Sequence, residues 1–189
     1  MSIDAFTSYS SNYTAMSSFT DQLVFSPKVL SDPLAEDEIL ARRKLLIKQT
    51  WRSVEFGLGE KATRSFYERL FSNFPEVQPM FENVSMKEQA HKLYSVLRLA
   101  VRSLDDLEAI LPTVQELGRR HAQSYGVARQ HYEAVTDTFV DVLHEYICSQ
   151  CSNMGCSTYM VDVADAWSWC LNFIGGIMAD AAEKAVAES

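Results

Sequence analysis

The sequence has few of the residues that interrupt helices, and this scarcity limits the fold class. Only 7 glycines and 5 prolines occur in 189 residues, while 47% of the residues are hydrophobic. A β-sandwich or barrel needs many turns, and therefore more residues of these two types. The composition favours long helices, with 10 Phe and 8 Tyr among the side chains that can form one core.

The chain also lacks an excess of basic residues and a long uninterrupted apolar run. Its 17 Lys and Arg are outnumbered by 25 Asp and Glu, so the formal net charge is −8 and nucleic acid is not an expected partner. The most apolar late stretch is broken by Asn172, Gly175 and Gly176, and no run reaches the roughly 18 to 20 residues that cross a bilayer. The N-terminus resembles neither a secretory signal nor a mitochondrial transit peptide. We therefore expect a cytoplasmic protein without a membrane span.

Residues 1–31 differ in composition from the rest of the chain. They are rich in Ser, Thr and Tyr and show little helical periodicity, which predicts a flexible N-terminal extension. Ser31 and Asp32 then precede Pro33, a pattern typical of a helix start. We expect residues 32–189 to form one domain. The extension is interpreted as a solvated tail, or alternatively as a regulatory or docking segment.

Apolar periodicity and capping residues predict the helices of this domain. Apolar residues at helical spacing predict helices over residues 32–51, 57–71, 132–146 and 163–178. Ser85 and Glu88 form a capping box, so Gln89 falls in the first turn of another long helix. Pro112 begins one further helix, which ends at Gly126.

The spacing of a few side chains within these helices carries the most specific information. His121 lies 32 positions after Gln89 and 40 positions after Phe81. Two helices that face each other across a planar ring need one residue below its centre and another above it, from distant segments. Further residues in the same register are Phe66, Tyr67, Leu70, Phe71, Phe74, Pro75, Leu93 and Tyr132. From about Leu34 to the C-terminus the chain resembles the globin family, in particular flavohaemoglobin haem domains and related single-domain globins, including neuroglobin-like ones.

The resemblance implies an all-α globin fold of about seven to eight helices around a haem b, preceded by the N-terminal extension. It implies that His121 is the axial ligand of the iron. The residues that it places against the haem, in addition to His121, are Phe81, Leu93 and Tyr132.

Tyr67 and Gln89 match the distal pair of flavohaemoglobin-like globins rather than a distal histidine. One histidine below the iron leaves the opposite position open, and a hydrogen-bond donor above it stabilises bound O2. The resemblance thus implies reversible binding of O2, and of NO or CO, for oxygen storage, scavenging or transport. His91 points about 200° away from Gln89 around the helix, so we do not expect it to be a second ligand.

Two other functions stay open at this point, so the sequence does not decide whether the protein is an enzyme. The first is a nitric oxide dioxygenase, in which bound O2 reacts with NO to give nitrate. It would need an external reductase, because the chain ends where a flavin and nicotinamide domain would begin. The second is a haem-based gas or redox sensor that acts through the extension or a group of cysteines.

Each candidate residue also has an interpretation without chemistry. A lone histidine such as His121 is more often a surface or core residue than a ligand. Tyr67 can be a half-buried core tyrosine, Gln89 a solvated helix residue and Phe81 a corner-packing residue. Gly118, one turn before His121, is expected to let the haem approach closely, unless it is an accident of surface composition.

The chain departs from the family pattern in two places. One extra residue lies between His121 and Tyr132. In the family a carboxylate on the last helix hydrogen-bonds near the proximal histidine and increases electron donation to the iron. That place falls near Lys184, with Glu183 beside it, which puts strongly oxidative chemistry in doubt.

Three of the four cysteines, Cys148, Cys151 and Cys156, are close in sequence at an expected helix junction, and Cys170 lies on an apolar stripe. The first three are interpreted as reduced thiols. A redox-linked disulfide is the functional alternative. A zinc site ranks third, since structural zinc usually requires four ligands.

Overall fold

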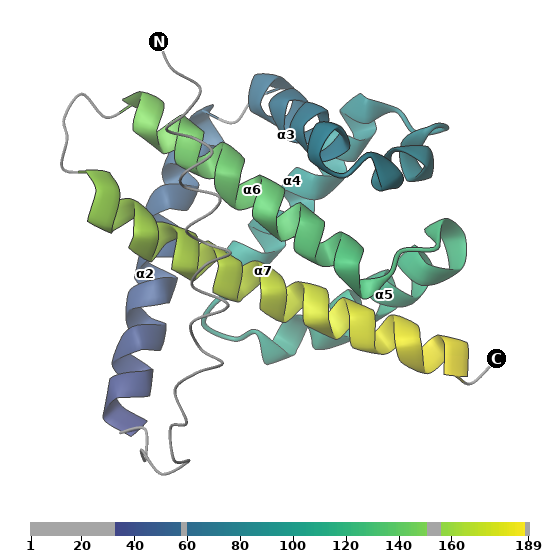
Figure 1. Ribbon diagram of the computed structural model, residues 1–189. Helices are drawn as coiled ribbons and strands as arrows, with labels where there is room; N and C mark the ends of the chain where they lie inside the picture. Colours follow the sequence, from purple (N-terminus) through teal and green to yellow (C-terminus); the bar gives the residue numbers. More distant parts are fainter. Residues whose placement is uncertain (1–32, 58–59, 151–155, 188–189) are drawn as a thin grey trace, which may run out of the picture. The chain divides into compact units, whose positions relative to one another are not determined.

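The computed structural model describes residues 33–57, 60–150 and 156–187, and the described part is helical (Figure 1). Its α-helices are α2 (Pro33–Gly57), α3 (Glu60–Asn73), α4 (Met86–Arg102), α5 (Leu111–Tyr125), α6 (Arg129–Gln150) and α7 (Cys156–Ala187). Two short 3-10 helices, η1 (Pro75–Phe81) and η2 (Glu108–Ile110), lie between them. These ranges contain no strand, which confirms the expected all-α class. Residues 1–31 lie outside the described residues, so the extension and its boundary stay predictions.

Local signals in the sequence set several helix ends as expected. At the start of α4, the Ser85 hydroxyl accepts a hydrogen bond from the backbone N–H of Glu88, at 3.4 Å. Gly126 ends α5 with a φ of 65°, in the left-handed region that glycine adopts most easily. The predicted end of the first helix near Trp51 is too early. This helix continues to Gly57 because no glycine or proline interrupts it before that residue.

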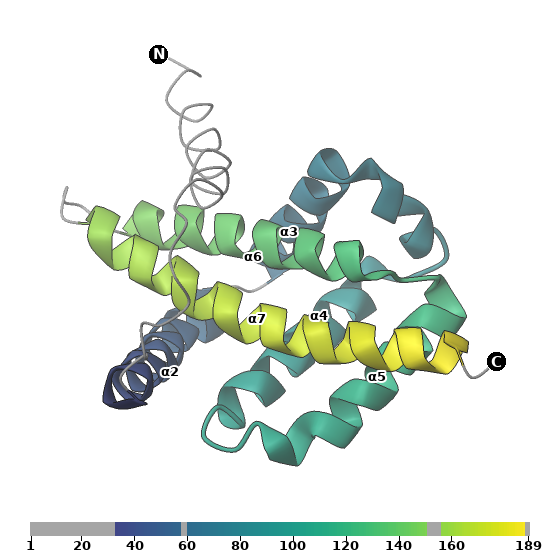
Figure 2. The same ribbon diagram turned by 60° about the horizontal axis from the view of Figure 1, so that its bottom comes forward.

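The later helices are joined by a series of pairwise contacts. Helices α6 and α7 lie side by side and run in opposite directions, and α5 packs along α7 (Figures 1 and 2). Helix α3 packs against α6 and α4. Helices α4 and α5, which carry Gln89 and His121, are therefore held mainly by different neighbours.

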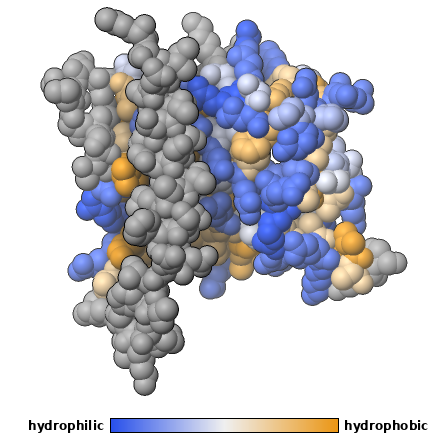
Figure 3. All heavy atoms as spheres, in the orientation of Figure 1, coloured by the Kyte–Doolittle hydropathy of each residue, from blue (hydrophilic) through white to orange (hydrophobic). Residues whose placement is uncertain are grey.

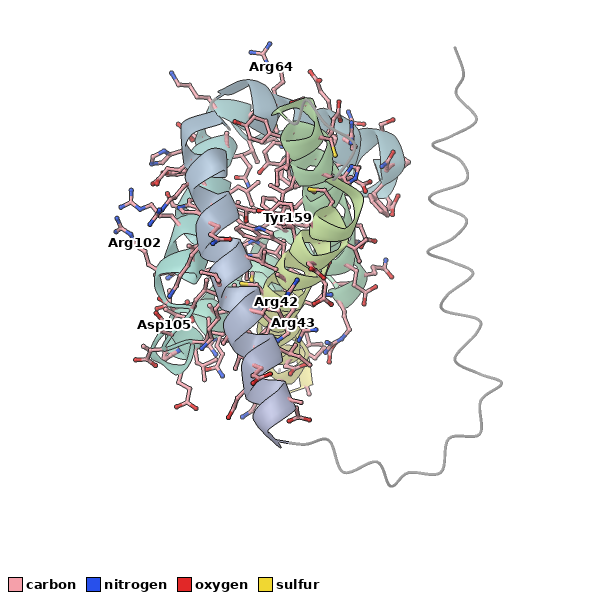
Figure 4. All side chains as sticks on the ribbon, turned by 90° about the vertical axis from the view of Figure 1, so that its left-hand side faces the viewer. Arg42, Arg43, Arg64, Arg102, Asp105 and Tyr159 are labelled. Atoms are coloured by element: carbon pink, nitrogen blue, oxygen red, sulfur yellow. The ribbon has the colours of Figure 1, made fainter. Side chains whose placement is uncertain are left out.

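A buried hydrogen bond and two ion pairs join α2 to α7. The indole N–H of Trp167 donates to the Thr50 hydroxyl at 2.9 Å, and that hydroxyl donates to the Leu46 carbonyl at 2.7 Å. Arg42 pairs with Asp162, and Arg43 pairs with Asp165 at 2.8 Å. Figure 4 shows Arg42 and Arg43 on the side of α2 that faces α7. This contact places the indole of Trp167, which is fully buried, at the centre of the core.

The surface of the described residues is mostly hydrophilic on the face shown in Figure 3. Hydrophobic side chains appear there in small, separate groups rather than in one broad area. Within the described ranges, no helix combines the length and the apolarity that membrane crossing requires.

Gly118 is a point of direct contact between two helix backbones. A Cβ atom at this position would lie 2.2 Å from the carbonyl oxygen of Met178 and 2.6 Å from its Cα. Gly118 therefore allows α5 to touch α7, and the expectation that it makes room for the haem is wrong. The alternative of an accidental surface glycine is also wrong, because Gly118 is buried.

We expect the substitution Gly118→Ala to destabilise the protein by about 1 to 3 kcal/mol, as overpacking of a close contact does. The matched control is Gly176→Ala on α7, where the described structure has nothing within 4 Å of an added Cβ. Alanine is the better helix former, so the control should be neutral or more stable. Urea unfolding of the three proteins tests this, and equal stability of the two variants would contradict it.

Candidate functional site

His121 lies near the end of α5 and is half-buried. Its Nδ1 is 2.8 Å from the Leu117 carbonyl oxygen, one helical turn earlier. The carbonyl can only accept, so Nδ1 carries the proton and Nε2 keeps a lone pair. Burial lowers the pKa of His121, and the hydrogen bond to Leu117 opposes this effect in part. A neutral imidazole with an oriented ring and an available Nε2 is the form in which histidine binds a metal.

Tyr132 of α6 stands next to His121. The two ring centroids are 6.3 Å apart. The Tyr132 hydroxyl is buried and has no hydrogen-bond partner among the described residues. Burial raises the pKa of Tyr132 to about 12, so the hydroxyl keeps its proton. Gly175 of α7 makes room for this side chain, because a Cβ there would lie 3.0 Å from that of Tyr132.

Tyr67 and Gln89 form a second group of neighbours, supplied by α3 and α4. The Tyr67 hydroxyl donates to the backbone carbonyl of Gln89, a long contact of 3.4 Å. Tyr67 is only 6% exposed, and this burial raises its pKa well above the ordinary value, although the Gln89 side chain opposes the shift. Tyr67 is therefore a protonated donor. Among the described residues, its hydrogen bond to the Gln89 carbonyl is a long one.

Phe81 and Leu93 complete the set of predicted residues. Phe81, the last residue of η1, lies edge-on to Tyr67 with ring centroids 5.6 Å apart, and 5.3 Å from Phe71. Leu93 follows Gln89 by one turn of α4 and packs, half-buried, against the core. The structure thus brings the predicted residues together in two groups. The proximal group is His121 with Tyr132, and the distal group is Tyr67, Gln89, Phe81 and Leu93.

The side chains of the two groups suit a planar apolar cofactor with a central metal. The one strong metal donor is the neutral imidazole of His121. Phe81, Leu93, Leu117 and Tyr132 are apolar or aromatic residues that pack on the core yet stay partly exposed. A flat apolar group between α4 and α5 would cover such surfaces. This combination fits haem, as the sequence predicts.

Other residues named from the sequence lie elsewhere. His91 is exposed on α4, in agreement with its expected direction. Glu183, the carboxylate next to Lys184, pairs with Arg129 at 3.1 Å rather than with His121. The acceptor for His121 is instead the Leu117 carbonyl, which sequence reasoning missed. The only sequence signal for it is the four-residue spacing common to all helices.

A large cleft adjoins the distal group at Tyr67. Its volume is about 1190 Å³, and residues of α2, α3 and α4 line it. Tyr67 and Phe71 are among its lining residues, so Tyr67 contacts both the cleft and Gln89. Arg64 at its edge projects outward, as Figure 4 shows.

The cysteines are only partly described. Cys148 is half-buried and Cys170 is fully buried. Cys151 lies outside the described residues, as does the side chain of Cys156. In the described part, no three His, Cys, Asp or Glu side chains are grouped so that they could hold a metal ion. The disulfide and zinc interpretations of the cysteine group remain untested.

Comparisons with known proteins agree with this arrangement. A sequence model of the globin family matches residues 64–176. A flavohemoprotein of Halalkalibacterium halodurans is 27% identical over 133 residues, which cover 69% of this chain and 30% of that protein. One of Bacillus thuringiensis subsp. konkukian is 34% identical over 89 residues, which cover 46% of this chain and 22% of that protein. The chain thus spans less than a third of the length of these two relatives.

Three solved structures share the fold. An engineered carbene transferase derived from a putative nitric oxide dioxygenase of Rhodothermus marinus has a TM-score of 0.63 and 21% identity, with 77% of this chain and 94% of that one covered. A bacterial globin from Campylobacter jejuni has a TM-score of 0.55 and 23% identity, with 80% and 99% covered. A hexacoordinated heme protein from an anhydrobiotic tardigrade has a TM-score of 0.59 and 17% identity, with 76% and 94% covered.

The lowered pKa of His121 predicts a pH dependence of stability. The unfolded chain binds a proton at this histidine below about pH 6.5, whereas the folded protein resists protonation until a lower pH. The contribution of His121 to folding is therefore complete above pH 6.5 and declines as the pH falls toward the folded-state pKa.

Urea unfolding at pH 7.5 and pH 5.5 measures this contribution. The loss of stability on acidification should be smaller in His121→Gln than in the parent protein. The exposed His91 provides the control, because His91→Gln should keep the parent's loss. If His121→Gln loses as much stability as the parent, the buried neutral state of His121 is wrong.

Proposed function

This chain belongs to the globin family, and we propose that it holds one haem b between α4 and α5, with His121 as the axial iron ligand. We further propose that it binds O2 reversibly, and also NO or CO, for oxygen storage, scavenging or transport. The observation that carries the proposal is the neutral His121 imidazole, oriented by the Leu117 carbonyl at 2.8 Å with its Nε2 lone pair available. Family membership itself implies haem and a gaseous ligand such as O2.

Each group has a distinct part in this function. A bound haem would be held by His121 and would supply an iron able to bind a diatomic ligand. The Leu117 carbonyl fixes the imidazole ring and its tautomer. Phe81 and Leu93 exclude water from the distal side, which strengthens polar interactions there. Tyr67, as a protonated donor, and the Gln89 amide stabilise negative charge that develops on the ligand.

The proximal hydrogen bond favours reversible binding over oxidative chemistry. A carboxylate partner would increase the electron donation of the histidine. Here the partner is a neutral backbone carbonyl, and Glu183 is already paired with Arg129. His121 therefore acts as an ordinary neutral imidazole rather than one with imidazolate character.

Nitric oxide dioxygenase activity with an external reductase is the second candidate. Its support is the neighbouring pair Tyr67 and Gln89, together with the similarity to flavohemoproteins. The chain covers less than a third of the two flavohemoproteins compared above, so their full activity is not transferred here. The sensor hypothesis depends on residues 1–31 and the cysteine group, and the cytoplasmic location stays a prediction from the sequence.

The first experiment records the visible absorption spectrum of the haem-reconstituted ferrous protein under argon. We expect a five-coordinate spectrum in the parent protein, because His91 faces away and Gln89 is a poor ligand for iron. His121→Ala should lose this spectrum, while the matched variant His91→Ala should retain it. A parent protein that fails to retain haem would sink the proposal. A six-coordinate ferrous spectrum would contradict the open ligand position.

A second experiment tests the distal donor. Tyr67→Phe removes a hydrogen bond to a partly charged ligand, worth about 1.5 to 3 kcal/mol, so O2 should dissociate about tenfold to a hundredfold faster. Tyr94→Phe is the matched control, because the Tyr94 hydroxyl bonds Glu55 at 2.9 Å on the surface. Stopped-flow displacement of O2 by CO gives both rates. An unchanged rate in Tyr67→Phe would remove Tyr67 from the site and leave the haem assignment intact.

A further inference from the structure

The last turns of α6 hold a thiol next to an imidazole, at a distance from the proposed haem site along the helix. The Cys148 Sγ lies 3.7 Å from the Nε2 of His144, within hydrogen-bond distance for sulfur. The two residues are four positions apart, so they share one face of the helix. Both are half-buried. Part of each residue is thus exposed to solvent, while Cys148 also packs against the hydrophobic core.

A carboxylate precedes this pair on the same helical face. Asp141 lies three residues before His144 and interacts with it electrostatically. Burial raises the pKa of Asp141, whereas Arg69 and then His144 lower it. Arg69 of α3 forms an ion pair with Glu145, and it is also the stronger of the two positive charges that lower the pKa of Asp141. Carboxylate, imidazole and thiol thus follow one another on this face of α6, and Asp141 interacts electrostatically with His144.

A carboxylate, an imidazole and a thiol in this order along one helical face can activate the thiol. The thiolate is the nucleophilic form of cysteine, and a cationic histidine stabilises it. Cys170 provides a contrast within the same chain. It is fully buried, and burial raises the pKa of its thiol to about 12, so it stays protonated and out of reach.

We propose that Cys148 is a reactive thiol, activated by His144, that forms mixed disulfides with low-molecular-weight disulfides such as glutathione disulfide. His144 takes the proton from Sγ, and the thiolate attacks one sulfur of the small disulfide. The disulfide bond breaks as the new bond to Sγ forms, and the leaving thiolate takes up a proton to become a free thiol. The small disulfide is the oxidant. The reaction is independent of haem and of the proposed oxygen binding.

The test follows modification of Cys148 by glutathione disulfide in the full chain, with the substitutions Cys151→Ser and Cys156→Ser to prevent disulfides within the cysteine group. Peptide mass spectrometry measures the mixed disulfide at Cys148 and at Cys170 separately. We expect modification at Cys148 alone. At pH 7, His144→Gln should slow it about threefold to tenfold, since fewer thiolates form. The exposed-histidine control His91→Gln should leave the rate unchanged.

A second measurement near pH 10 separates activation from access. Ordinary thiols ionise at about pH 8.5, so at pH 10 the thiolate forms with or without His144. The rates of the parent and His144→Gln should then converge. A difference that persists at pH 10 would mean that His144 only controls access to Cys148, and would overturn the proposal. Equal rates at pH 7, or a Cys148 that stays reduced, would also overturn it.

Discussion

The contact between the backbones of α5 and α7 at Gly118 sets the position of His121. An α-helix is stiff over a few residues, so a contact one turn before His121 fixes the height and rotation of its side chain relative to α7. Met178 is the partner, and its carbonyl oxygen would lie 2.2 Å from any Cβ on residue 118. A side chain there would push α5 away from α7 and carry the imidazole with it. The proposed iron ligand thus depends on the absence of a side chain.

The same close packing determines which polar groups surround His121. With α5 against α7, the ring of His121 faces Tyr132 of α6, whose hydroxyl is buried without a partner in the described structure. Arg129, one turn before Tyr132, draws Asp180 and Glu183 of α7 into ion pairs at the surface. The carboxylates of Asp180 and Glu183 are thereby engaged with Arg129. The backbone carbonyl of Leu117 remains as the acceptor for His121.

The sequence predicted those features that depend on local rules. Ser85 and Gly126 mark helix ends because a cap or a left-handed residue acts within one turn. The distal pair was predicted through the globin resemblance, and the structure has Tyr67 and Gln89 as neighbours. The role of Gly118 was not predictable in this way, because the sequence does not show which helix faces a glycine. Ridges of one helix can fit several grooves of another, and only the packed core decides among them.

Ion pairs are unpredictable from sequence for a related reason. With 17 basic and 25 acidic residues, each arginine has many acceptors, and the pairing depends on tertiary distances. Glu183 illustrates the consequence. The family pattern places a carboxylate near Lys184, and Glu183 is the neighbouring residue. Glu183 pairs with Arg129 because α6 packs against α7. The sequence thus departs from the family pattern at Lys184, and in the structure the neighbouring Glu183 forms an ion pair with Arg129.

The two sides of the proposed haem site act on the bound ligand in different ways. Burial keeps the proton on Tyr67, so the distal side can donate a hydrogen bond and retain a polar ligand. On the proximal side, a neutral carbonyl partner limits the electron density that His121 supplies. Retention of O2 depends mainly on the distal hydrogen bond, whereas activation of O2 depends strongly on electron donation from the proximal histidine. Under the proposed function, a distal tyrosine that keeps its proton, combined with a histidine paired to a neutral carbonyl, favours retention of O2 over its activation.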